Sequence, residues 1–237
     1  MGIAENVEEI REHIAAAAQR AGRRADDVVL MGVSKTFPAE AILEAHAAGI
    51  RVFGENRVQE FADKSALLEG VPNEGLPNAQ WHLIGHLQSN KANRATELFH
   101  AIDSVDSLKL AERLNTAAAA HGRKLRVLIE INIGGEEAKA GLHPDAPEFN
   151  QILQAAPRLD YLEIEGFMTI PPFAENPEEA RPYFRKLREL RDATAARRLP
   201  NVNMNVLSMG MSHDFEIAIE EGSTCVRVGT AIFGQRG

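Results

Sequence analysis

Apolar residues recur along the chain in two alternating patterns. Short runs rich in valine, isoleucine and leucine predict strands, and stretches with apolar residues three or four positions apart predict helices. The predicted strands are 28–34, 51–54, 81–85, 99–103, 125–133, 161–168, 203–208 and 225–229. The predicted helices between them are 38–48, 56–69, 89–98, 106–121, 145–156, 177–197 and 213–221.

The first 24 residues predict one further helix, ahead of the first strand. Ile3, Val7, Ile10 and Ile14 lie at helical spacing, with glutamates between them. These acidic residues argue against a transit peptide, and the interrupted apolar pattern argues against a signal peptide. No run approaches the ~18 consecutive apolar residues of a membrane span. We therefore expect a cytoplasmic protein that does not bind membranes.

Strands that alternate with helices predict a parallel sheet, and eight such strands are the number that closes a (β/α)8 TIM barrel. The 237 residues are close to the ~250 typical of that fold, and no low-complexity linker divides them. We expect residues 1–237 to form a single barrel domain with the extra helix at its N-terminus. An open, doubly wound sheet is the alternative architecture.

The charge balance and the cysteine content limit the kinds of site. Lys and Arg together number 26 against 34 Asp and Glu, a net charge of −8, which argues against general nucleic-acid binding. Cys225 is the single cysteine, so neither a disulfide within the chain nor a cysteine-based metal site is expected. His82 and His86 would lie about 13 Å apart on an extended strand, too far to share a metal.

Alternation along the predicted strands directs polar side chains into the barrel. Val226 and Val228 suit the helix-covered outside, which sends Arg227 inward. Glu130 and Asn132 likewise lie on the face opposite a row of isoleucines in 125–133. Buried polar groups need partners or a ligand, so the interior of the barrel predicts a binding site.

Lys35 lies where the apolar run at the start of VLMGVSKTFP ends. It is on the same strand face as Met31 and Val33. A lysine at the mouth of the barrel can form a Schiff base with a carbonyl compound. The alternative is a solvated lysine where the strand ends. Lys139, in the loop after 125–133, is a second amine on the same side, but an ordinary surface lysine is the better interpretation.

The last two predicted strands are followed by loops suited to phosphate. Barrels commonly bind phosphate with the loops after strands seven and eight and the start of a short helix. Ser208, Gly210, Gly229 and Thr230 supply hydroxyls and unobstructed backbone N–H groups there. A lysine opposite a phosphate site fits pyridoxal phosphate, or a sugar phosphate handled by a lysine aldolase.

A series of motifs resembles the pyridoxal phosphate homeostasis protein family: VSKTFP, FGENRVQE, WHLIGHLQSNK, GFMTIPP, LSMGMSHDFEIAI and GSTCVRVGTAIFG. They extend from about Val28 to Gly234. The family is similar to the barrel domain of alanine racemases without their second domain. The sequence departs from its relatives at Arg57, where an aromatic residue is frequent, and at His86, where proline is frequent.

The resemblance implies a cofactor site. Lys35 would hold pyridoxal 5'-phosphate as an aldimine, and Arg227 would face the pyridine nitrogen. The remaining implied contacts are Ser208, Gly229 and Thr230 to the phosphate and Asn56, His82 and Met168 around the ring.

Two functions follow from this site: a carrier or buffer of the cofactor for vitamin B6 homeostasis, or a weak amino-acid racemase. Arginine has no acceptor and keeps its proton, which weakens the ring as an electron sink. Alanine racemases use a tyrosine as second base, whereas here Tyr161 is expected near the buried start of a strand and Tyr183 in an outer helix. We expect a monomeric carrier without robust catalysis, with apo-forms of pyridoxal phosphate enzymes as partners.

Overall fold

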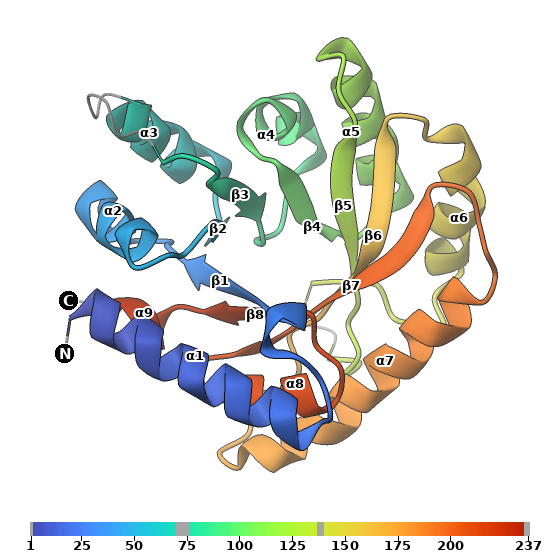
Figure 1. Cartoon of the computed structure of the whole chain (residues 1–237). Coiled ribbons are helices and arrows are strands. Elements are labelled where there is room, and N and C mark those ends of the chain that lie inside the picture. Colours follow the sequence, from blue (N-terminus) through green and yellow to red (C-terminus); the bar gives the residue numbers. More distant parts are fainter. Residues whose placement is uncertain (1, 70–75, 137–139, 235–237) are drawn as a thin grey trace.

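The computed structural model describes residues 2–69, 76–136 and 140–234 and contains a closed barrel of eight parallel strands (Figure 1). The first strand pairs with both the second and the eighth, which closes the sheet. The prediction of a (β/α)8 barrel is therefore confirmed, and the alternative of an open sheet is wrong. The strands are β1 (Val29–Val33), β2 (Val52–Glu55), β3 (Gln80–Leu83), β4 (Ala101–Val105), β5 (Leu125–Glu130), β6 (Leu162–Met168), β7 (Val202–Met211) and β8 (Cys225–Val228).

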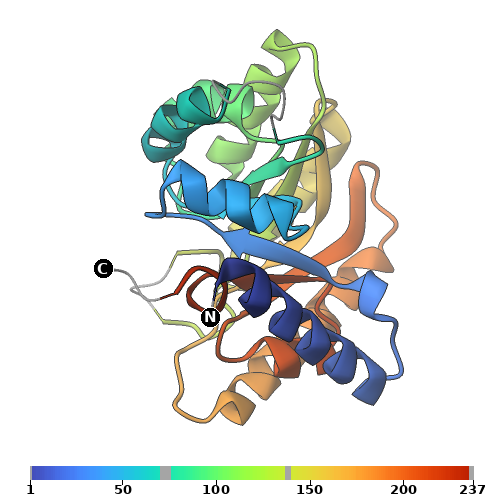
Figure 2. The same ribbon diagram turned by 60° about the vertical axis from the view of Figure 1, so that its left-hand side comes forward.

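Helices connect successive strands and surround the barrel (Figures 1 and 2). Short 3-10 turns form the beginnings of two predicted helices, at Ser89–Lys91 and Pro177–Ala180. The helices are α2 (Ala39–Ala47), α3 (Val58–Glu69), α4 (Ala92–Leu98), α5 (Leu108–Ala120), α6 (Pro147–Ala155), α7 (Arg181–Ala195), α8 (Phe215–Glu220) and α9 (Thr230–Phe233). In the described part of the chain, no helix is long and apolar enough to cross a bilayer.

The predicted N-terminal helix is α1 (Ile3–Arg20), which lies on the outside of the barrel along α8 (Figure 1). Its apolar stripe is buried, with Val7, Ile10 and Ile14 at most 5% exposed. Arg20 pairs with Glu216 at 2.8 Å and with Glu220 at 2.7 Å, both carboxylates belonging to α8. The periodicity read from the sequence therefore corresponds to a docked helix.

Several strands begin or end at other residues than predicted, because contacts with distant segments determine the local backbone conformation. Phe99 precedes β4 and packs against Phe61 of α3, with ring centroids 4.8 Å apart and the rings tilted by 39°. β5 ends at Glu130, and Ile131 makes only a single bridge to Leu142. β7 continues to Met211 instead of ending at 208.

Glycine permits the close approach of β6 and β7. A Cβ atom on Gly166 would lie 1.8 Å from the carbonyl oxygen of Val206, and the strand register shifts beside it. Any other residue would separate the two strands that lead toward the mouth of the barrel.

Candidate functional site

Four of the predicted site residues lie just beyond the C-terminal ends of strands. Lys35 follows β1 and is half-buried, and Asn56 follows β2. Gly229 and Thr230 follow β8. Because the strands are parallel and form one closed barrel, these residues lie at the same end of the barrel, where barrel enzymes build their sites.

Asn56 is held by the neighbouring loop. A Cβ atom on Gly85, which follows β3, would lie 2.3 Å from the carbonyl oxygen of Asn56. Only glycine therefore allows the loops after β2 and β3 to pack at this distance.

Three further predicted residues form a buried layer below this end. Met168, Ser208 and Arg227 are 0%, 0% and 3% exposed. Ser208 pairs in register with Met168, and Met168 pairs with Glu130. The side chains of Glu130, Met168 and Ser208 therefore share one face of β5, β6 and β7. The prediction that Arg227 and Glu130 face the interior is confirmed.

The guanidinium of Arg227 is fixed by its neighbours. Nη1 donates to the carbonyl oxygen of Ser208 at 2.6 Å and to its hydroxyl at 2.8 Å, and Nη2 donates to the carbonyl oxygen of Thr169 at 2.8 Å. Burial lowers the pKa of Arg227, and the carboxylates of Asp103, Asp214 and Glu130 oppose that effect. Among the described residues, the hydrogen bonds of Arg227 come from Nη1 and Nη2, which leaves the donor on Nε for a ligand atom.

The loops after β7 and β8 meet through their hydroxyls. Thr230 donates from Oγ1 to Oγ of Ser212 at 3.2 Å, and the backbone N–H of Ala231 points to the same oxygen at 3.5 Å. Ser212 does not stand out in the sequence from the other small residues of the motif LSMGMSHDFEIAI. The hydroxyl of Ser208, which the resemblance assigns to phosphate, is buried and accepts a hydrogen bond from Arg227.

Glu130 is a buried carboxyl group within this layer, at 5% exposure. Burial raises its pKa to about 7, assisted by Asp106 and opposed by Arg227 and His86. Within the described structure, its Oε2 has no hydrogen-bond partner. The group therefore exchanges a proton near neutral pH.

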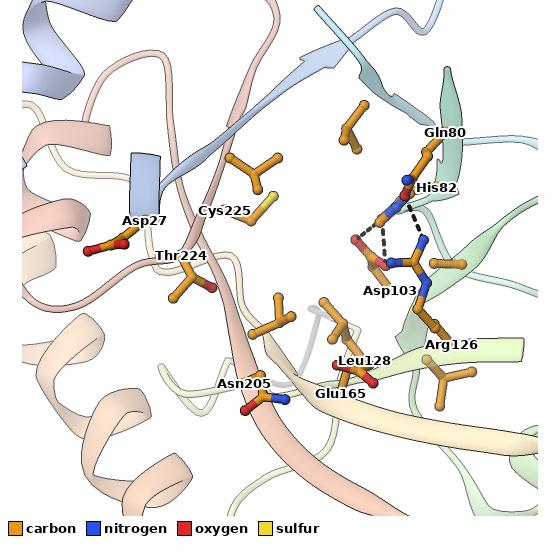
Figure 3. Close-up of a pocket in the computed structure, with 15 residues that line it drawn as sticks. Asp27, Gln80, His82, Asp103, Arg126, Leu128, Glu165, Asn205, Thr224 and Cys225 are labelled. Atoms are coloured by element: carbon orange, nitrogen blue, oxygen red, sulfur yellow. Dashed lines mark hydrogen bonds and ion pairs between the residues drawn. The ribbon is translucent and has the colours of Figure 1, made fainter. Parts of the chain in front are cut away.

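His82 lies deeper, in β3, and faces a cavity of about 400 Å³ (Figure 3). The first residues of several strands line this cavity, including Val29, Val52 and Ala101, so it opens at the N-terminal end of the barrel, opposite Lys35. Nδ1 of His82 lies 3.1 Å from both carboxylate oxygens of Asp103. Its contact with a cofactor ring remains a prediction.

Two further polar groups of this cavity have their chemistry fixed by their surroundings. Arg126 donates to Oε1 of Gln80 at 2.6 Å (Figure 3). Burial raises the pKa of the Cys225 thiol to about 12. The thiol therefore stays protonated at neutral pH and is a poor nucleophile.

Several residues singled out in the sequence lie away from this layer. His86 pairs with Asp106 at 2.9 Å and is exposed, and Arg57 is exposed after β2. Tyr161 precedes β6 at the N-terminal end and is 40% exposed, so the expectation that it lies at a buried strand start is wrong. Tyr183 lies in the outer helix α7. Lys139 lies outside the described residues.

The C-terminal end of the barrel fits a flat aldehyde that carries a phosphate group. Lys35 supplies a primary amine, and Arg227 presents a fixed N–H donor from the buried layer. Ser212, Thr230 and the beginning of α9 supply hydroxyls and backbone N–H groups. These three elements are the groups that pyridoxal phosphate requires: a partner for the aldehyde, one for the ring nitrogen and one for the phosphate.

Comparison with known proteins identifies the family. Residues 6–237 match the family model of the alanine racemase N-terminal domain. The pyridoxal phosphate homeostasis protein of Aquifex aeolicus is 44% identical over 236 residues, covering 100% of this chain and 99% of that protein. Its namesake in Escherichia coli K12 is 42% identical over 234 residues, covering 99% and 97%.

A solved structure shows the same architecture. PipY of Synechococcus elongatus PCC7942, with pyridoxal phosphate bound, superposes with a TM-score of 0.82 at 38% identity, covering 98% of this chain and 100% of PipY. The closed barrel and the similarity along nearly the whole chain point to the same family. This chain belongs to the pyridoxal phosphate homeostasis protein family, built on the alanine racemase N-terminal domain.

Proposed function

We propose that this chain binds pyridoxal 5'-phosphate at the C-terminal end of its barrel, as a Schiff base with Lys35, and carries or buffers the cofactor for vitamin B6 homeostasis in the cytoplasm. The observation that carries the proposal is the position of Lys35 at the same barrel end as a buried, immobilised Arg227. The relatives' names and the PipY complex support it.

When bound, the cofactor supplies an aldehyde that condenses reversibly with an amine and releases one water. Lys35 contributes that amine, and Arg227 donates a hydrogen bond from Nε to the ring nitrogen. Thr230, Gly229 and the α9 N-terminus hold the phosphate through a hydroxyl and backbone N–H groups. The resemblance assigns Asn56, His82 and Met168 to the ring and adds Ser208 to the phosphate contacts.

The positions of the tyrosines support a carrier. Tyr161 lies at the opposite end of the barrel, and Tyr183 lies on an outer helix. Neither is placed to exchange a proton on the face of the ring opposite Lys35. A missing acid–base group costs roughly 10²–10⁴ in rate, and a protonated Arg227 accepts no proton from the ring.

One observation favours a second function, weak racemisation of amino acids. Glu130 lies in the same buried layer as Arg227 and its pKa is about 7, so it can donate or accept a proton at neutral pH. Its place beside Met168 on β5 leaves it on the inner wall of the barrel.

Transfer to an apo-enzyme tests the carrier role. The loaded protein, in its proposed monomeric form, is mixed with increasing concentrations of an apo-form of a pyridoxal phosphate enzyme, and recovered enzyme activity is followed in time. The carrier role predicts transfer faster than the release of cofactor into buffer. Transfer limited by release at every acceptor concentration contradicts direct delivery.

A further inference from the structure

The turn that carries Lys35 is tied to helix α3 on both sides. Lys64 donates from Nζ to the carbonyl oxygen of Ser34, the residue before Lys35, at 2.9 Å. Glu60 accepts from the backbone N–H of Thr36, the residue after Lys35, at 2.5 Å. The two helix residues lie one turn apart and form an ion pair of 2.9 Å.

A buried carboxylate of β2 completes the cluster. Glu55 is 0% exposed, and its Oε1 accepts from the Ser34 hydroxyl at 2.8 Å and from Lys64 at 3.0 Å. Burial raises the pKa of Glu55, and Lys64 and Ser34 oppose that effect. An ammonium group has three N–H donors and no acceptor. One carbonyl and two carboxylates therefore surround the Lys64 ammonium group, which holds it between the turn, β2 and α3.

The backbone that these contacts hold is an uncommon one. Thr36 has φ +69°, in the left-handed region that β-branched residues rarely adopt. Such a conformation persists only where the surrounding structure over-determines it, and it gathers at functional sites. Here the bonds from Glu60 and Lys64 act on the peptide groups on either side of Lys35.

We propose that Glu60 and Lys64 are positioning residues for Lys35: together with Glu55 they fix the turn so that the Lys35 amine is presented to the aldehyde. The inference rests on the proposed function in so far as Lys35 is the reacting amine. A preorganised amine binds its partner more tightly because less order remains to be imposed on binding.

The first test needs no cofactor. Amide hydrogen exchange at Thr36 is measured by NMR in the unliganded wild-type protein, Glu60→Ala, Glu60→Gln and Gln59→Ala. Gln59 is exposed on the same helix and its side chain donates to Asp63, away from the Lys35 turn, so it is the matched control. We expect exchange at Thr36 to become at least about tenfold faster in Glu60→Ala, with Glu60→Gln close to wild type because its amide oxygen still accepts. Unchanged exchange in Glu60→Ala overturns the positioning role.

The second test measures the consequence for binding. Titration with pyridoxal phosphate, followed by absorbance, is expected to show about tenfold weaker affinity and slower adduct formation in Glu60→Ala. Glu60→Gln should largely restore both, and Gln59→Ala should match wild type. Circular dichroism and urea unfolding confirm that each variant is folded. Wild-type affinity and rate in Glu60→Ala overturn the inference.

The role of Lys64 is tested without leaving a buried charge alone. The double variant Glu55→Gln/Lys64→Met removes both charges together and should weaken adduct formation in the same direction as Glu60→Ala. Wild-type behaviour of this double variant overturns the role of Lys64. If wild-type protein forms no adduct on Lys35, the proposed function fails, whereas the exchange measurement still decides whether Glu60 holds the turn.

Discussion

Arg227 donates hydrogen bonds to both the carbonyl oxygen and the hydroxyl of Ser208, at 2.6 and 2.8 Å, from one strand to its neighbour in the barrel. Both residues are buried, and a third bond reaches the carbonyl oxygen of Thr169 on the far side. The guanidinium therefore takes its position from the backbone of β6 and β7. The fold itself therefore fixes the guanidinium below the C-terminal end of the barrel, before any ligand binds.

Replacing Ser208 with Ala should weaken binding of pyridoxal phosphate and of pyridoxal by a similar factor, because in this structure Ser208 acts through Arg227. The free energy of unfolding should fall by about 1 kcal/mol, since the carbonyl oxygen still accepts from Nη1. Titration with both compounds, together with urea unfolding, checks this. A loss confined to the phosphorylated compound would assign Ser208 to the phosphate, as the resemblance implies.

Replacing Thr230 with Val should act on the phosphate alone. A charge-assisted hydrogen bond is worth about 1.5–3 kcal/mol, so we expect affinity for pyridoxal phosphate to fall by roughly ten- to a hundredfold and affinity for pyridoxal to change little. Thr116→Val, an equal change at an exposed position on α5, is the control. Equal losses of affinity for the two compounds would show that this loop does not bind the phosphate group.

Glu130 should make stability fall as pH rises toward neutrality. Its pKa in the folded protein is raised from 4.5 to about 7, so below pH 4.5 the stabilisation of the protonated group is fully present, and it is lost as pH rises to about 7. At about 1.4 kcal/mol for each tenfold change in proton affinity, the loss is of the order of 3 kcal/mol. Glu130→Gln should lack this part of the pH dependence in urea unfolding between pH 4 and 8.

The wild-type protein is the comparison that isolates Glu130. Burial also raises the pKa of Glu55 and of Asp214, and both groups are present in the two proteins. Parallel stability curves for wild type and Glu130→Gln would show that Glu130 titrates near its ordinary value.

The sequence alone was sufficient for the barrel and for the inward direction of Arg227 and Glu130. Both follow from alternation within single strands, which is a local property of the chain. The buried layer of Met168, Ser208 and Arg227 also follows, once the strands are placed side by side in order.

Contacts between distant segments were beyond reach of the sequence. Lys64 has the pattern of an ordinary helix lysine, and its burial depends on Glu55, the last residue of β2, and on Ser34, which follows β1. The depth of His82 depends on the register of β3 with its neighbours. The helix α9 is too short to show periodicity, so the contact between Ser212 and Thr230 was not visible either.

Proton exchange separates the carrier from the racemase. With L-alanine and other amino acids in heavy water, we expect changes in the cofactor spectrum without sustained exchange of the α-proton, because neither tyrosine is near Lys35. Mass spectrometry of the amino acids measures the exchange. Turnover near the ~1–10³ s⁻¹ of ordinary enzymes would overturn the carrier role, and its loss in Glu130→Gln would identify the base.

The covalent attachment of pyridoxal phosphate to Lys35 tests the central claim most directly. The loaded protein is reduced with borohydride, digested and mapped by mass spectrometry, alongside Lys35→Ala and the exposed control Lys109→Ala. We predict the reduced adduct on Lys35 in wild type and Lys109→Ala, and its disappearance in a folded Lys35→Ala protein. An adduct found mainly on another lysine, or retained in Lys35→Ala, would contradict the account.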